Sequence, residues 1–336
     1  MKTYSEAGVD IDKKDVFLNE LLKHLKFKRK NLSPFLGAGH YSALVNFGGY
    51  YVAINTDGVG TKMLVADEMK KWDTVGIDAI AMNVNDTICV GAEPFAFVDY
   101  LVISDYDMKK AKEIGKGLNR GSKRSNISIV GGETAVMPDM VKGTDLSGTA
   151  IGFVKKGKQI TGKKIKNGDL IIAIKSSGLH SNGFTLVRKL LKEHNFSYSD
   201  KIGSKTIGEI LLTPTEIYVK TVLDIIKNSS VNGLAHITGG GLRNLVRLSN
   251  KKFVIDDPIK PQKIFSFIQE IDNIDYKEMY QTFNMGMGFM VIAPEKDENT
   301  IREILKNHGM FGKTVGHIEE GNGVYLPEYN ITYDRY

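Results

Sequence analysis

The chain has 336 residues, of which 42% are hydrophobic and 25% are charged, as in a globular protein long enough for two domains. It carries 45 Lys and Arg against 39 Asp and Glu, and because the two signs are mostly interspersed, the net charge of +6 does not indicate a nucleic-acid partner. No apolar run approaches the roughly 18–20 residues that span a bilayer, no signal-peptide core is present at the N-terminus, and the single cysteine, Cys89, excludes an internal disulfide and a cysteine-based zinc site. We therefore expect a cytoplasmic protein that binds neither nucleic acid nor a membrane.

Helices and strands alternate irregularly along the first half of the chain. Apolar periodicity predicts a helix over 16–25. The basic cluster at its end, 23–30, fits either a solvated helix end or a surface that attracts phosphate-bearing small molecules. Segments rich in aromatic and β-branched residues predict strands, and longer periodic segments predict helices. The strands are 50–55, 95–103, 127–130 and 148–155, and the helices are 73–90 and 108–120.

A basic, glycine-containing stretch over 155–168 is the best candidate for a domain boundary. We place the two domains at 1–160 and 165–336. In the second domain, Thr213 as cap and Pro214 in the first turn predict a helix over 214–227. Further helices are predicted over 184–192, 242–248 and 299–307, and strands over 170–175, 233–237, 286–293, 314–318 and 323–326.

Glycines cluster directly after predicted strands, where an α/β-type protein exposes backbone N–H groups to a ligand. The clusters are Gly58/Gly60, Gly131/Gly132, Gly178/Gly183 and 239–241. The sequence contains no P-loop, G-x-G-x-x-G, H-E-x-x-H or G-x-S-x-G motif. These absences argue against P-loop, dinucleotide-binding, zincin and serine-hydrolase chemistry.

The segment NTDGVGTK, residues 55–62, brings a carboxylate to the end of a hydrophobic strand. Two glycines, a hydroxyl and a lysine follow Asp57. A magnesium–phosphate site needs these groups: a hard oxygen ligand, close backbone approach and a cation. A tight turn in which Asp57 accepts local backbone N–H groups is the alternative.

The apolar helix predicted over 73–90 carries Asn83 and Asp86, three residues apart and hence on one face. A buried anion costs several kcal/mol unless it is paired or binds a metal, so Asp86 is either a metal ligand or part of a hydrogen-bonded polar pair. Asp99, in the next strand, poses the same question. Glu133 and Thr134 end a third strand beside Gly132.

Two loops of the second half are dense in hydrogen-bond donors and lead into helices, whose N-termini attract anions. The first, SSGLHSNG over 176–183, contains Ser177, His180, Ser181, Asn182 and Gly183. The second contains Thr238, Gly239, Gly240 and Gly241, and a third glycine-rich segment follows Asn284. Flexible capped turns are the alternative for each loop. His180 has the chemistry of a proton carrier.

Together these segments resemble the phosphoribosylformylglycinamidine cyclo-ligases, or aminoimidazole ribonucleotide synthetases. The family's ATP signature is Asp, four residues, then Gly-Ala-x-Pro, which Asp86, Gly91, Ala92 and Pro94 match. Other matching segments, in order and over nearly the whole chain, are 4–10, 56–62, 76–86, 131–135, 176–183, 236–241 and 279–286.

The resemblance implies an α+β fold with two domains, the first of which binds ATP and forms a barrel-like sheet with its copy in a homodimer, while the second is an α/β sandwich-like, substrate-binding domain. It implies a ligase that cyclises formylglycinamidine ribonucleotide to aminoimidazole ribonucleotide with ATP in purine biosynthesis. The cofactors are then ATP and Mg²⁺. The metal is assigned to Asp57, Asp86 and Glu133, and catalysis to Asp57, Lys62 and His180.

The nucleotide is assigned to residues of the first half and the substrate to residues of the second. The nucleotide residues are Asp57, Gly58, Gly60, Thr61, Lys62, Asn83, Asp86, Gly91, Ala92, Pro94, Gly132 and Thr134. The substrate residues are Ser177, His180, Ser181, Asn182, Gly183, Thr238, Gly239, Gly240, Gly241 and Asn284.

One position departs from the pattern expected of the family. His40, in the glycine-containing segment 35–42, either contacts substrate or caps a mobile loop. Selenophosphate synthetases and the hydrogenase-maturation enzyme need a cysteine that this chain lacks at the matching place, and thiamine-monophosphate kinases lack the loop 176–183. The related amidotransferase that makes the substrate is the closest enzymatic alternative, and a non-catalytic nucleotide or RNA binder is the alternative of another class.

Overall fold

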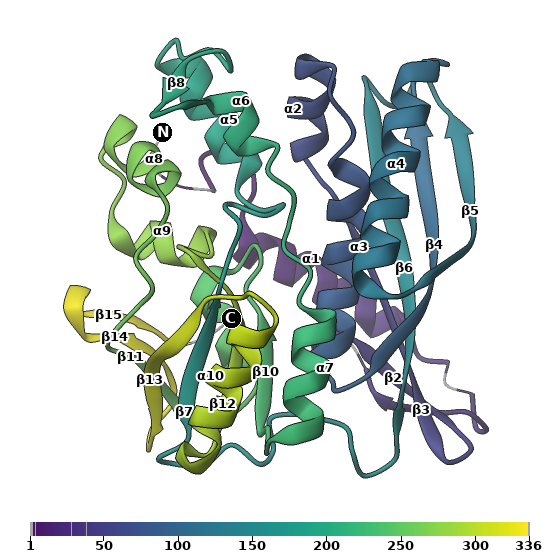
Figure 1. The fold of residues 1–336 in the computed structure, drawn as a ribbon. Helices are drawn as coiled ribbons and strands as arrows, with labels where there is room; N and C mark the ends of the chain where they lie inside the picture. The colour runs from purple at the N-terminus through teal and green to yellow at the C-terminus, as the bar shows by residue number, and fades with distance from the viewer. Residues whose placement is uncertain (1–2, 4, 28, 38, 335–336) are drawn as a thin grey trace.

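Two sheets, each with helices beside it, lie side by side in the computed structural model (Figure 1). It describes residues 3, 5–27, 29–37 and 39–334; Tyr4, in the first matching segment, lies outside them. We refer to the chain up to residue 160 as the N-terminal half and to the chain from residue 165 as the C-terminal half.

The N-terminal half forms a six-stranded sheet in which only β4 and β5 run parallel. Its order is β1 (Pro34–Leu36), β2 (Ala43–Phe47), β3 (Tyr50–Gly58), β6 (Thr144–Lys155), β4 (Glu93–Ile103) and β5 (Ser128–Val136). The helices α3 (Val75–Ile88) and α4 (Met108–Ser125) cover one face, and a short helix, α2 (Lys62–Met69), follows β3. The strand predicted over 127–130 continues to Val136, because its glycines keep pairing with β4.

The C-terminal half forms a seven-stranded mixed sheet and a two-stranded ribbon. The sheet order is β10 (Gly233–His236), β12 (Met287–Ala293), β7 (Leu170–Lys175), β13 (Gly312–Glu319), β11 (Lys252–Ile255), β14 (Gly323–Leu326) and β15 (Ile331–Tyr333). Its helices are α5 (Phe184–Glu193), α6 (Ile207–Leu211), α7 (Val219–Asn228), α8 (Lys263–Asp272), α9 (Tyr276–Thr282) and α10 (Glu298–Asn307). The ribbon pairs β8 (Lys201–Ile202) with β9 (Lys205–Thr206), and the 3-10 helices are η1 (Gly241–Arg247), η2 (Glu295–Asp297) and η3 (Pro327–Tyr329).

Helix α3 is the central element of the molecule. It packs against β3, β6, β4 and α4 on one side and against α7 and β10 of the other half. Every residue from Val75 to Ile88 is buried except Asp86. A helix that is apolar on all sides belongs in a protein interior, and there each polar side chain of α3 needs a partner.

The predicted helix over 214–227 is wrong at its N-terminus, since α7 begins only at Val219. The backbone N–H groups of Thr215 and Tyr218 instead donate to the Asp78 and Asn85 side chains of α3. These tertiary bonds hold 213–218 out of the helix, so Pro214 is not in a first helical turn. The helix predicted over 242–248 is the 3-10 helix η1 rather than an α-helix.

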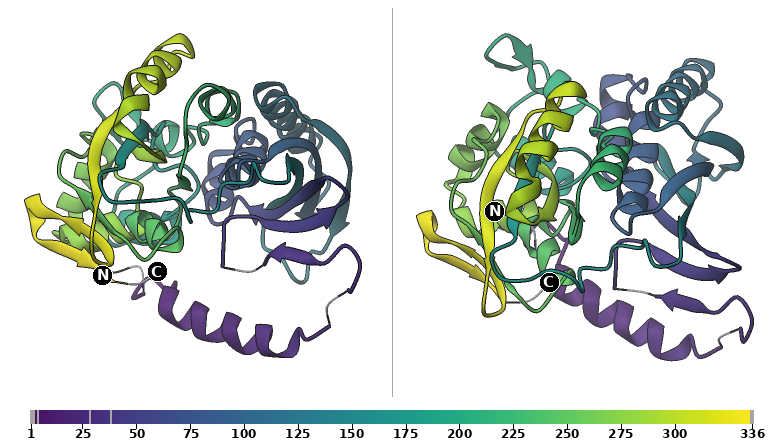
Figure 2. Two further views of the ribbon diagram at one scale, coloured as in Figure 1. Left: turned by 90° about the horizontal axis from the view of Figure 1, so that it is seen from below. Right: turned by 60° about the horizontal axis from the view of Figure 1, so that its bottom comes forward.

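The helix predicted over 16–25 is α1 (Ile11–His24), capped by Asp10, whose side chain accepts from Lys13 N–H. Figure 2 shows α1 lying below both halves, with the chain then leading to β1 and β2. The apolar side chains Val16, Phe17 and Leu21 of α1, and Leu25 directly after it, are exposed. Among the described residues, no helix is both long and apolar enough to cross a bilayer.

Candidate active site at the junction of the two halves

Asp57 lies at the end of β3 and is anchored to α3 through its own backbone. Its N–H donates to Asn83 Oδ1 at 2.9 Å, and Asn83 Nδ2 donates to its carbonyl at 3.0 Å. Its carboxylate accepts from Gly58 N–H at 2.8 Å, as the tight-turn interpretation expects. Asn83 therefore holds the strand end in place for the Asp57 side chain.

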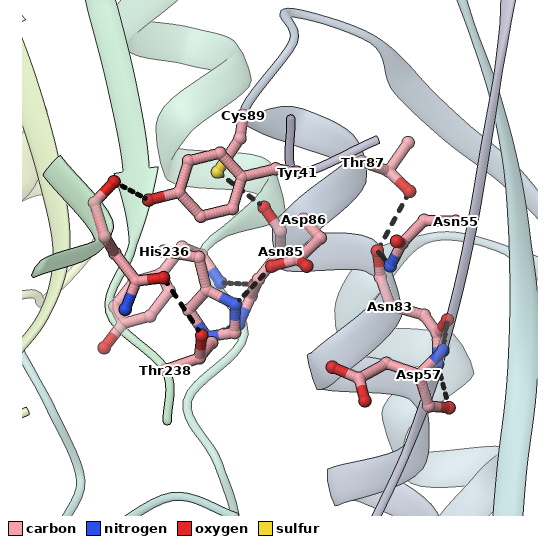
Figure 3. A network of polar contacts seen from close by, with 12 residues as sticks. Tyr41, Asn55, Asp57, Asn83, Asn85, Asp86, Thr87, Cys89, His236 and Thr238 are labelled. Atoms are coloured by element: carbon pink, nitrogen blue, oxygen red, sulfur yellow. Dashed lines mark hydrogen bonds and ion pairs between the residues drawn. The ribbon is translucent and has the colours of Figure 1, made fainter. Parts of the chain in front are cut away.

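Asp86 is the one α3 residue that is not fully buried, with 14% of its side chain exposed. Its Oδ1 lies 2.7 Å from Nδ1 of His236, a fully buried residue of β10. Asp86, His236, Asp57 and Thr238 lie close together where the two halves meet (Figure 3). The polar pair considered for Asp86 is thus present, and its partner comes from the other half of the chain.

The Asp86 carboxylate acts on that of Asp57. Burial, followed by the negative charge of Asp86, raises the pKa of Asp57 from 3.8 to about 6. Two nearby carboxylates favour a bound cation, because the cation relieves their repulsion. Mg²⁺ in nucleotide sites is commonly held by one or two carboxylates together with phosphate oxygens, so the Asp57 and Asp86 pair fits a magnesium–nucleotide complex.

Glu133 does not join this pair within one chain. The strand register places Asp57 in one row with Gly132, three strands away. Glu133 is the next residue of β5, and since successive strand residues point to opposite faces, its side chain lies on the other face of the sheet. Thr134 lies on the same exposed edge strand. Among the described residues, no group of three or more His, Cys, Asp or Glu could hold a metal ion.

Lys62 is fully buried at the start of α2. Its Nζ lies 3.0 Å from both carboxylate oxygens of Asp78 and donates to the carbonyls of Thr213 (2.7 Å) and His180 (3.0 Å). Burial lowers the pKa of Lys62, and the Asp78 charge opposes that shift. In this structure the amine joins the two halves; its predicted contact with phosphate stays a prediction.

Asp78, the counter-ion of this cation, also accepts hydrogen bonds from residues of the C-terminal half. Its Oδ1 accepts from Thr215 N–H and Thr215 Oγ1, both at 2.7 Å, and from Ser181 Oγ at 3.3 Å. Neither Asp78 nor Thr215 is among the site residues predicted from the sequence. The signal was available for Asp78, because an acid in the middle of an apolar helix must have a partner.

His180 is buried with a left-handed backbone, φ 64°. Its Nε2 accepts from Ser177 N–H at 3.3 Å, and its Nδ1 has no hydrogen-bond partner among the residues that the structure describes. Burial holds the pKa of His180 well below its usual value. The ring packs on Gly288, where a Cβ would lie 2.6 Å from its Cε1 and 2.1 Å from the Tyr218 hydroxyl. Its role as proton carrier stays a prediction.

Three predicted substrate segments meet at the junction. A Cβ on Gly239 would lie 3.0 Å from Asn182 Oδ1, so the loops 176–183 and 238–241 touch. Asn284 Nδ2 donates to the carbonyl of Gly178 at 2.8 Å and ties the third segment to the first. Ser177 Oγ donates to Pro214 O at 2.6 Å, so this hydroxyl holds 213–215 in place. Gly183, Gly240 and Gly241 complete the two loops.

The remaining nucleotide-assigned residues form turns at the ends of β3 and α3. Gly60, at φ 68°, precedes Thr61, whose Oγ1 lies 2.9 Å from Thr185 Oγ1 of α5. Gly91, at φ 75°, turns the chain from α3 into β4 with Ala92 and Pro94 buried behind it. The Asp-x4-Gly-Ala-x-Pro signature is therefore a compact turn that fixes the end of α3, next to Asp86.

His40 lines a groove of about 650 Å³ with Lys163 and Arg247. Among the described residues, neither ring nitrogen has a partner with good hydrogen-bond geometry. Burial and the charge of Arg247 lower the pKa of His40 to about 4, while the Thr161 backbone acts in the opposite direction. The next residue, Tyr41, donates to Asn244 O at 3.0 Å and reaches the junction shown in Figure 3. Both interpretations of His40 stay open.

Comparison with known proteins assigns the family. Models described as AIR synthase related protein, N-terminal domain and C-terminal domain, match residues 39–154 and 166–327. The chain is 50% identical over 322 residues to the phosphoribosylformylglycinamidine cyclo-ligase of Methanosarcina mazei, covering 95% of each chain. It belongs to this family. The cyclo-ligase of Methanocaldococcus jannaschii is 49% identical over 95% of this chain and 92% of that protein.

The cyclo-ligase family assignment confirms the resemblance and the α+β fold with two AIR-synthase parts. Among solved structures, AaThiL complexed with AMPPCP and TMP has a TM-score of 0.66 at 18% identity, covering 95% of this chain and 96% of that one. At that identity the likeness concerns the fold.

Asp57→Asn is expected to stabilise the protein when nucleotide and metal are absent. A carboxyl whose folded-state pKa is raised adds stability at low pH, and this is lost as pH rises through that pKa. The contribution of Asp57 to the free energy of unfolding therefore falls as the pH rises from 3.8 to about 6. Because the side chain is only partly buried, we expect the free energy of unfolding of Asp57→Asn to exceed that of the wild type by on the order of 1 kcal/mol at pH 7.5. The difference should be smaller at pH 5. Thermal unfolding of both proteins at the two pH values measures it; an unchanged or opposite difference would refute the shift.

Proposed function

We propose that the chain converts formylglycinamidine ribonucleotide and ATP into aminoimidazole ribonucleotide, ADP and phosphate. The observation that carries the proposal is one junction: the Asp57 and Asp86 carboxylates lie beside His236 and Thr238, and the loop 238–241 touches the loop 176–183 there. The names of the family members supply the reaction.

The reaction needs an activated oxygen because an amide oxygen is a poor leaving group. The formyl oxygen attacks the γ-phosphorus and ADP leaves; an amidine nitrogen then attacks the formyl carbon, and the carbon–oxygen bond breaks to release phosphate. Mg²⁺, when bound, neutralises charge on the transferred phosphoryl group. Asp57 and Asp86 are suited to hold it, and the turn at Gly60 and Thr61 is suited to offer backbone N–H groups to the phosphates.

The C-terminal half supplies the substrate side. Asn182, Thr238 and Gly239 lie where the loops 176–183 and 238–241 touch, and they are suited to bind the ribonucleotide and orient its amidine. Lys62 and Asp78 lock the first loop onto α3. The N-terminal half then binds the nucleotide and the C-terminal half binds the ribonucleotide. Most of the catalysis comes from positioning these two reactants across the junction.

The test supplies formylglycinamidine ribonucleotide with ATP and Mg²⁺ and follows both products. We expect ADP and aminoimidazole ribonucleotide in equal amounts. ADP release without ring closure would indicate an ATPase or kinase, and salt-sensitive RNA binding without ATP turnover would favour the non-catalytic alternative.

We further propose that the uncovered face of the N-terminal sheet pairs with a second copy. Tyr50 and Phe95 both pack against Phe153, with ring centroids 5.9 Å apart, and all three are 39–48% exposed. Ile54 and Tyr100 are also exposed. A contiguous apolar patch of this kind marks a protein interface, and pairing would also bury the edge strand β5.

Phe153→Lys is expected to leave the protein monomeric at micromolar concentration, since a charge would be buried in the middle of the interface. Phe311→Lys, which changes an exposed phenylalanine of the other half, is the matched control and should stay dimeric. Sedimentation equilibrium measures both. A monomeric wild-type protein, or a dimeric Phe153→Lys variant, would contradict the proposed assembly.

A further inference from the structure

The imidazole of His236 is held between two adjacent residues of α3. Its Nδ1 lies 2.7 Å from Asp86 Oδ1, and its Nε2 lies 3.5 Å from Asn85 Nδ2. The ring is fully buried and packs near Phe289, 6.3 Å between centroids. The proton on this ring can therefore be deduced from the partners at its two nitrogens.

The orientation of the Asn85 amide is fixed by two backbone groups of known polarity. Tyr218 N–H, which can only donate, points at Asn85 Oδ1 at 3.0 Å. Glu216 O, which can only accept, lies 2.8 Å from Asn85 Nδ2. Reversing the amide would break both bonds. Asn85 therefore presents its NH₂ group to His236.

The tautomer of His236 follows from this orientation. Nε2 faces a donor and must accept, so the proton resides on Nδ1, where it is donated to Asp86 Oδ1. The described residues form no hydrogen bond with Asp86 Oδ2, so the second oxygen is available for a ligand.

We infer that His236 is a positioning residue that locks the Asp86 carboxylate through an Nδ1–H donor and ties it to the substrate loop. His236 lies two residues before Thr238, the first residue of the loop 238–241. A shift of this loop therefore moves the group that orients Asp86, which links the nucleotide side of the junction to the substrate side. The second part of this inference rests on the proposed function.

The first test reads the tautomer in the wild-type protein. Proton–nitrogen correlation spectra of protein with ¹⁵N-labelled histidine, with the His236 signals identified by their loss in His236→Gln, show which ring nitrogen carries hydrogen. We expect Nδ1 protonated and Nε2 unprotonated at pH 7.5. A proton on Nε2 in the wild-type protein would overturn the inference.

The second test uses the two amide side chains that mimic the two nitrogens. The nitrogen of asparagine is attached at the same distance from the backbone as Nδ1, and that of glutamine lies one bond farther out, as Nε2 does. We expect His236→Asn to retain Mg²⁺–ADP affinity within about threefold, and His236→Gln to lose about 10–100-fold, as for other partners of metal-ligating groups.

Calorimetric titration with Mg²⁺–ADP measures the affinity, and thermal unfolding checks that both variants fold. His308, whose Nε2 lies 3.0 Å from Asp224 away from the junction, supplies the control: His308→Gln should bind as the wild type does. Equal losses or no loss in two folded His236 variants would overturn the inference. If the wild type binds Mg²⁺–ADP but closes no ring, the proposed function fails while the order of the two variants still stands.

Discussion

Asp86→Asn is expected to reduce turnover by roughly a thousandfold or more while leaving the fold intact. The amide oxygen can still accept from His236 Nδ1–H at the 2.7 Å contact, so the junction is preserved. The charge that would hold the metal is removed, and metal stabilisation of a phosphoryl transition state is worth several kcal/mol, or roughly tenfold per 1.4 kcal/mol.

ADP release and ring formation measure the loss, and thermal unfolding measures the fold. Asp99→Asn is the matched control, because Asp99 is a partly buried acid on β4 in the same half of the chain, and burial raises its pKa. It should keep most of the activity. Near-normal turnover in Asp86→Asn would remove Asp86 from the site.

Asp78→Ala is expected to cost about 3–5 kcal/mol of unfolding free energy, because it leaves the Lys62 cation buried without a counter-charge. Thr215 N–H loses its acceptor in the same step. Lys62→Met should also be destabilising, because it leaves the Asp78 carboxylate buried without its counter-charge. The double variant should cost less than the sum of the two, since removing both charges leaves neither one unpaired.

Urea denaturation of the wild type, the two single variants and the double variant measures their free energies of unfolding, and so the coupling between Lys62 and Asp78. Glu20→Ala removes an exposed partner of Lys23 on α1 and should cost less than about 1 kcal/mol. Additive single effects, or an Asp78→Ala protein as stable as the wild type, would show that the pair does not hold the halves together.

Local patterns predicted the residues of the junction better than their partners. Asp57 stood out as an acid at a strand end beside glycines, and Asp86 as an acid in an apolar helix, since each signal depends on a few neighbouring residues. The bond from Asp86 to His236 joins residues 150 positions apart. It depends on how the two halves dock, and no periodicity encodes that.

The predicted helix start at Pro214 is a case in which tertiary contacts override a local sequence rule. The local rule for proline in a first turn is sound, but the Asp78 and Asn85 side chains compete for the backbone N–H groups of this segment. Glu133 illustrates the effect of register: its place beside glycines resembled that of Asp57, while strand pairing puts the two side chains on opposite faces. Both outcomes are decided by tertiary structure.

Oxygen transfer tests the central claim most directly. Formylglycinamidine ribonucleotide labelled with ¹⁸O in the formyl group is incubated with the enzyme, ATP and Mg²⁺, and the released phosphate is examined by mass spectrometry. If the junction activates the formyl oxygen by phosphorylation, each aminoimidazole ribonucleotide formed is matched by one phosphate that carries ¹⁸O. Unlabelled phosphate accompanying ring closure would contradict the account.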